Sequence, residues 1–138
     1  MLNDQYGTQH VSRFPRDKIS VLLFAASTGS AQLKAWIKPI YARYQDILAL
    51  YGVADLTAVP EFFQSFVPLA VRAQVQYPVM LDWEGTVSRD YASQQGQTNL
   101  FVVNTQGDIV LKVVGSVSAA RLQRVLAQIN GLLATQAQ

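Results

Sequence analysis

The feature that most constrains the fold is an alternation of short runs of branched apolar residues with longer stretches whose apolar residues recur at helical spacing. Continuous short apolar runs are typical of strands covered on both faces. They lie at 19–26, 47–53, 78–82, 99–104 and 108–114, and the helical stretches at 31–46, 60–71, 87–91 and after Ser118. The order β-α-β-α-β-α-β-β-α predicts an α/β fold with a central, largely parallel mixed sheet and helices on both faces.

The last two strands flank the short polar segment Thr105-Gln106-Gly107, which predicts an antiparallel hairpin at the C-terminal edge of the sheet. Near the start, residues 4–18 are interpreted as a hairpin or an irregular lead-in with a turn at Tyr6-Gly7. No repeat or low-complexity linker interrupts the chain, and 138 residues suit one hydrophobic core. We therefore expect a single domain over 1–138.

Composition and charge exclude several classes of protein. Half of the residues are hydrophobic and 14% are charged, which excludes a disordered chain. The net charge of +2 comes from scattered basic residues, so neither a nucleic-acid footprint nor a membrane-surface helix is expected. No secretory signal or membrane-spanning segment is visible, which suggests a soluble chain but leaves the compartment open: cytoplasmic by default, extracytoplasmic if the chain was trimmed.

Several segments, in matching order along nearly the whole chain, resemble the thioredoxin superfamily, in particular its peroxiredoxin and TlpA-like thiol–disulfide reductase branches. Residues 20–27, Ser-Val-Leu-Leu-Phe-Ala-Ala-Ser, are similar to the family's first-strand motif V-L-x-F-W-A-S. The other similar segments are 4–7 (D-Q-x-G), 77–82 with Gly85 and Tyr91 (F-P-V-L-L-D-x-x-G and a later Tyr), and 101–110 with Gly115 (F-L-I-D-x-x-G-x-I-V and a later Gly). The resemblance implies a thioredoxin-like fold.

The chain departs from this family where its chemistry resides. The family places a Cys-x-x-Cys pair, or one peroxidatic cysteine, just after the first strand, and this chain has no cysteine. Counting from Phe24 places the two cysteine positions at Gly29 and Gln32, whereas matching Pro39 to the family's helix proline places them at Ala31 and Lys34.

The family's cis-proline position falls on Thr98. Because a non-proline cis bond costs about 2.5–4 kcal/mol, the peptide before Thr98 is expected to be trans. Thiol exchange and peroxide reduction both need a thiolate, so neither is expected here. The term "vacated site" below denotes the residues at these positions, namely Ser27, Thr28, Gly29, Ser30, Ala31, Gln32, Lys34 and Thr98.

For chemistry other than thiol chemistry, we expect no catalytic residue, metal or cofactor. His10, the single histidine, lies in the lead-in with no evident nucleophile beside it. The loop 27–30 precedes a helix and could bind an anion, but capping of that helix is the preferred interpretation. Asp82, Glu84 and Asp90 surround a turn without the spacing of a calcium loop.

The predicted helices carry two sets of aromatic residues. Trp36, Tyr41 and Tyr44 are expected to face the core. On the stretch 60–71, Phe62, Phe63 and Phe66 do not share one helical stripe, so one of Phe62 and Phe63 could be exposed, joined by Tyr51 or Trp83. Core packing is the preferred interpretation of these phenylalanines, and a partner or dimer surface is the alternative.

The leading hypothesis is a redox-inactive thioredoxin-like domain that binds a protein partner or a small ligand. The vacated site is its first candidate surface, and the helix with Phe62, Phe63 and Phe66 is the second. Two alternatives remain open: a non-thiol enzyme, for example a hydrolase, on the same scaffold, and a structural module of a larger assembly.

Overall fold

A five-stranded sheet with the order β5-β4-β3-β6-β7 forms the centre of the molecule in the computed structural model. The structure describes residues 2–4, 6–7, 9–10, 17–26, 30–57, 59, 61–74, 79–91 and 97–136. The strands are β3 (Ser20–Ala26), β4 (Ala49–Asp55), β5 (Val79–Asp82), β6 (Asn99–Val103) and β7 (Ile109–Val114). A separate antiparallel pair, β1 (Leu2–Asn3) and β2 (Gln9–His10), precedes them.

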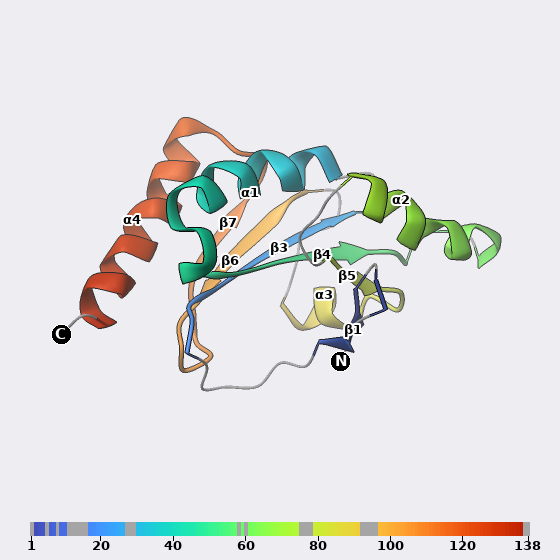
Figure 1. The fold of residues 1–138 in the computed structure, drawn as a ribbon, viewed down its shortest axis with the longest axis horizontal. Helices are drawn as coiled ribbons and strands as arrows, with labels where there is room; N and C mark the ends of the chain where they lie inside the picture. The colour runs from blue at the N-terminus through green and yellow to red at the C-terminus, as the bar shows by residue number, and fades with distance from the viewer. Residues whose placement is uncertain are drawn as a thin grey trace.

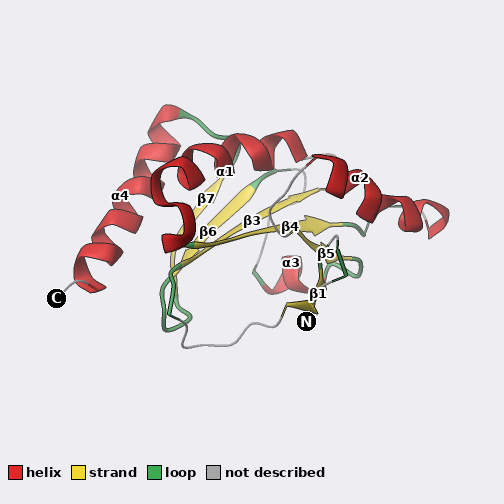
Figure 2. Cartoon of the chain, viewed as in Figure 1, coloured by secondary structure: helices red, strands yellow, loops and turns green. Residues whose placement is uncertain are grey.

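The sheet is parallel on one side of β3 and antiparallel on the other. β3, β4 and β5 run parallel, whereas β6 is antiparallel to β3 and β7 is antiparallel to β6. The helices are α1 (Ser30–Tyr44), α2 (Val67–Gln74), α3 (Thr86–Asp90) and α4 (Ala119–Gln136), with 3-10 segments η1 (Gln45–Ile47) and η2 (Glu61–Phe66). Figures 1 and 2 show α1, α2 and α4 over one face of the sheet and α3 over the other. The predicted α/β architecture is confirmed.

Alternate side chains of β3 supply two apolar clusters, one on each face of the sheet. Val21 and Leu23 pack with Trp36 and Ile40 of α1 and with Val125 of α4. The even-numbered positions 22 and 24 of β3 pack on the opposite face with β4, β6 and α3. A third cluster lies between α2 and the strands β4 and β5. The strand is therefore buried on both faces, as its unbroken apolar run predicts.

The predicted hairpins are present. At the C-terminal hairpin, Asn104 Oδ1 accepts hydrogen bonds from the backbone N–H groups of Gln106 (3.0 Å) and Asp108 (2.9 Å), and Gly107 adopts a positive φ of 99°. Near the N-terminus, the backbone N–H of Gly7 donates to the carbonyl oxygen of Asp4 (3.0 Å), which closes the expected turn.

Two sequence predictions were wrong around the end of α1. The strand expected at 47–53 begins only at Ala49, because η1 follows α1 and Gln45 takes a positive φ of 48° that turns the chain back toward the sheet. Ile47 is consequently 57% exposed. Tyr41, expected in the core, is 50% exposed, because Trp36, Ile40 and Tyr44 already fill the inward stripe at intervals of four residues.

We expect Ser20→Ala to leave the free energy of unfolding unchanged or to raise it by about 1 kcal/mol. The Ser20 hydroxyl is buried in β3 and has no hydrogen-bond partner, so its removal abolishes an uncompensated desolvation cost. Urea denaturation of the purified variant measures the change.

Ser88→Ala is the matched control, because Ser88 is equally buried but its hydroxyl donates to Asp82 Oδ2 at 2.9 Å. It should destabilise the fold by about 1–3 kcal/mol, since a buried carboxylate loses a donor. Equal losses of stability for the two variants would contradict this account.

Candidate functional site

The described residues that flank the vacated site lie at one edge of the sheet. The parallel strands β3, β4 and β5 end at this edge with Ala26, Asp55 and Asp82. Because β6 is antiparallel to β3 and Phe24 pairs with Asn99, the start of β6 lies beside the end of β3. Thr98 directly precedes β6 and is therefore close to the end of β3.

The structure describes only part of the vacated site. Ser27, Thr28 and Gly29 lie outside the described residues, as does the proposed helix cap. Ser30, Ala31 and Gln32 form the first turn of α1, and their side chains are likewise not described. Lys34 is exposed on α1, whereas Thr98 is 1% exposed. These residues remain a predicted surface, of which Thr98 is a buried member.

A turn at Gly115 lies at this edge and is held by hydrogen bonds to Thr98 and Trp36. The Gly115 N–H donates to the carbonyl oxygen of Thr98 (2.7 Å), and the indole Nε1–H of buried Trp36 donates to the carbonyl oxygen of Gly115 (3.1 Å). Arg121 of α4 lies against the same glycine, and its guanidinium Nη1 donates to the carbonyl oxygen of Ser116 (3.0 Å). The turn therefore ties β6, β7, α1 and α4 together, and the Thr98 carbonyl is engaged within the fold.

Two aspartates at the same edge serve structural roles. Asp55 and Asp82 are register partners on β4 and β5. Buried Asp82 accepts hydrogen bonds from Ser88 N and Ser88 Oγ, both at 2.9 Å, and thereby caps α3. Asp55 Oδ1 accepts from Thr57 N (3.1 Å) and Thr57 Oγ1 (2.7 Å). The buried Asp82–Ser88 pair is out of reach of a substrate, so it does not support hydrolase chemistry.

No metal centre is evident in the described part of the chain. No group of three or more His, Asp or Glu side chains there is arranged to hold an ion. Glu84 is exposed, and the nearby Arg89 guanidinium donates to its backbone carbonyl oxygen (3.2 Å). His10 lies on β2, within the lead-in hairpin, as expected. Within the same residues, no helix has both the length and the apolarity to cross a bilayer.

The second candidate surface is the segment η2, and here the preferred prediction was wrong. Phe62, Phe63 and Phe66 are 72%, 50% and 63% exposed, so all three lie outside the core. Large exposed apolar residues elsewhere in the described chain, such as Tyr41 and Ile109, are scattered. We call the three phenylalanines of η2 the aromatic tip.

The segment η2 is a 3-10 helix and not part of the α-helix that the sequence pattern predicted. In a 3-10 helix, residues three apart eclipse each other, so Phe63 and Phe66 lie on one stripe. The ring of Phe62 packs beside that of Phe63, with centroids 4.3 Å apart and planes tilted by 43°. The three rings thus lie on two adjoining sides of η2, and all three are exposed.

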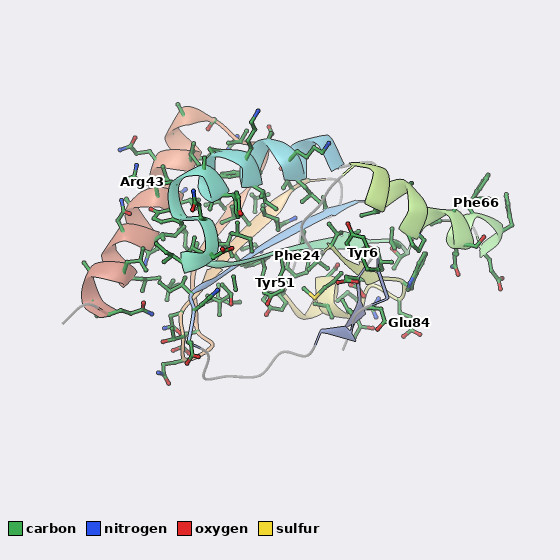
Figure 3. The ribbon with its side chains drawn as sticks, viewed as in Figure 1. Tyr6, Phe24, Arg43, Tyr51, Phe66 and Glu84 are labelled. Carbon is green, nitrogen blue, oxygen red and sulfur yellow. The ribbon has the colours of Figure 1, made fainter. Side chains whose placement is uncertain are left out.

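The aromatic tip lies beyond the part of the α2 region that packs on the sheet. Val67 and Val71 of α2 and Trp83 are half-buried against the cluster at β4 and β5. Figure 3 shows Phe66 at the far end of the molecule, beyond α2, and Tyr51 well away from it. Tyr51 packs instead against the cluster on the opposite face of the sheet, so it does not extend the aromatic tip.

Comparison with solved structures finds close matches over most of the chain. The exposed lipoprotein thioredoxin Etrx1 of Streptococcus pneumoniae superimposes with a TM-score of 0.72, at 17% identity, covering 92% of this chain and 96% of that one. A thiol-disulfide oxidoreductase of Bacteroides fragilis matches with a TM-score of 0.66, at 16% identity, covering 93% and 94%. The chain has the thioredoxin-like fold.

A peroxiredoxin-type neighbour supports the same assignment. The bacterioferritin comigratory protein of Xanthomonas campestris, described for its alkyl peroxide reduction activity, matches with a TM-score of 0.66, at 16% identity, covering 94% of this chain and 89% of that one. No protein-family model matches the sequence, and the search of curated proteins finds no match either. The thioredoxin-like fold is therefore established by structure, with sequence identity too low to carry an activity across.

The thioredoxin-like chain lacks the reactive group of thiol chemistry. It contains no cysteine, so it has no thiolate with which to attack a disulfide or a peroxide. Serine and threonine hydroxyls are weak nucleophiles without an adjacent base and cannot replace it. Thiol oxidoreductase activity is accordingly not available to this chain.

We expect purified protein to show no reduction of insulin and no consumption of hydrogen peroxide above the buffer rate, because no sulfur is available to carry electrons. Turbidity of insulin with dithiothreitol and peroxide-electrode traces provide the measurements. A variant with cysteines at both Gly29 and Gln32 tests whether the scaffold still supports exchange. Turnover by the cysteine-free protein, with contaminants excluded, would overturn the assignment.

Gly115→Ala should lower the free energy of unfolding by about 1–3 kcal/mol. Gly115 adopts a φ of 116°, and an added Cβ would lie 3.1 Å from Arg121 Cζ. Thermal unfolding followed by circular dichroism measures the loss. Gly131→Ala is the control, because Gly131 lies within α4 with nothing within 4 Å of an added Cβ. It should stabilise by about 0.5–1 kcal/mol, and a loss at both positions would contradict the explanation.

Proposed function

We propose that this chain is a single, redox-inactive thioredoxin-like domain that binds a protein partner through the aromatic tip. The observation that carries the proposal is the exposure of all three phenylalanines within one five-residue segment. Taking about 200 Å² for a fully exposed phenylalanine, these fractions leave about 370 Å² of aromatic surface in water. That is the size at which the largest apolar patch of a monomeric protein is often functional.

The described residues favour the aromatic tip over the vacated site. Thr98 is buried and its carbonyl oxygen already accepts a hydrogen bond from Gly115 N. Lys34 is a solvated cation on the outer side of α1, where a lone exposed lysine is ordinary. The aromatic tip instead offers residues of a type enriched at the centres of interfaces.

Folding provides no reason for the exposure of the aromatic tip. The α2 region already buries Val67 and Val71 against the cluster at β4 and β5, which fixes the helix on the sheet. Phe62 and Phe63 contact each other, yet each keeps at least half of its surface in water. Exposed aromatic surface is unfavourable in water, and binding would remove that cost.

We expect the triple substitution of Phe62, Phe63 and Phe66 by serine to weaken partner binding at least tenfold. Buried aromatic anchors commonly contribute 2 kcal/mol or more each, and about 1.4 kcal/mol corresponds to a factor of ten. The domain is immobilised, exposed to extract of cells that produce it, and the retained proteins are quantified by mass spectrometry. Stability should change by less than about 1 kcal/mol.

The control for this variant is a triple substitution of Tyr41, Ile47 and Ile109 by serine, which removes exposed apolar residues lying elsewhere on the molecule. It should retain the same partner at wild-type levels. The proposed function fails if no protein is retained reproducibly, or if both triple variants retain the partner equally.

A further inference from the structure

One charged side chain directly precedes the three phenylalanines. Within η2, Glu61 is the only charged residue, and the first basic residue after it is Arg72 in α2. Glu61 occupies the first turn of η2, directly before Phe62, and is exposed. An exposed carboxylate therefore lies at the edge of the aromatic surface.

Self-association fits this surface poorly. A stable interface buries about 800 Å² on each partner, roughly twice the aromatic area of the tip. In a two-fold dimer the same patch meets itself, so two convex segments would face each other. Contact between two tips would also offer Glu61 no cation to pair with, because η2 carries none.

A membrane surface also fits poorly. Peripheral segments that combine aromatic residues with membrane binding carry lysine or arginine on their polar face, which attract anionic lipids. The segment η2 carries a carboxylate and no cation. The tip itself therefore offers anionic lipids no attracting charge.

We propose, as an inference resting on the proposed function, that the partner is a protein with an apolar groove that receives the three rings and a lysine or arginine at its rim that pairs with Glu61. Short helical segments are bound in this way, with side chains three and four positions apart as anchors. In the 3-10 segment η2, Phe63 and Phe66 are three apart and share one side, and Phe62 lies on the adjoining side. The cation at the rim sets orientation and speeds association.

The test uses the whole chain with the photoreactive amino acid p-benzoylphenylalanine at position 66, irradiated in extract of the producing cells. Position 47 is the control site, because Ile47 is similarly exposed, at 57% against 63% for Phe66. We expect a covalent product at position 66 only, with cross-linked peptides that line an apolar groove of one partner protein.

Charge reversal then separates the two proposals. Glu61→Lys should lower the yield of this product, or the affinity for the purified partner, about tenfold, and a lysine-to-glutamate change at the partner's rim should restore it. The matched control is Asp46→Lys, because Asp46 is likewise the exposed acid in the first turn of a 3-10 segment, η1. It should have no effect.

The outcomes distinguish failure of the proposed function from failure of the inference about the partner. No product above the level at position 47 refutes binding through the aromatic tip, and the inference falls with it. A product with a second copy of the chain, or a protein product indifferent to Glu61→Lys, refutes the inference alone, because a protein still binds at the tip. A product with lipid refutes both statements, because the proposed partner is a protein.

Discussion

The burial of β3 on both faces is the constraint on which the other elements depend. Because the strand pairs along its length with β4 on one side and β6 on the other, its backbone polar groups are satisfied within the sheet. Its alternating side chains then supply apolar contacts to α1 and α4 on one face and to α3 on the other. A polar side chain at an inward position therefore needs its own partner, which Ser20 lacks.

The same strand ends where thioredoxin-like proteins usually carry their reactive cysteines, and here that edge is tied together by backbone contacts instead. Trp36, Gly115 and Thr98 form a chain of hydrogen bonds from α1 through the turn after β7 to the start of β6. These bonds preserve the geometry of the edge although it has no thiol to position. The scaffold therefore remains intact for reasons of packing, and its retention does not indicate redox chemistry.

In the aromatic tip, apolar residues are exposed although their sequence pattern is typical of a buried segment. An apolar segment normally indicates a buried element. Here Val67 and Val71 of α2 pack on the cluster at β4 and β5, whereas Phe62, Phe63 and Phe66 of η2 are not part of that cluster and are exposed. The tight 3-10 turn keeps their side chains close together. The proposed contact with another protein rests on this concentration of exposed aromatic surface.

The sequence by itself determined the order of the strands and helices, the hairpins and the absence of thiol chemistry, because apolar periodicity and turn residues such as Asn104 and Gly107 act locally. Only the tertiary structure decided which apolar residues are buried. Tyr41, Ile47 and Phe66 lie in patterns typical of core, but a 3-10 turn or a filled stripe leaves each of them exposed. Burial of a side chain depends on whether another element packs against it, and the local sequence pattern does not determine that packing.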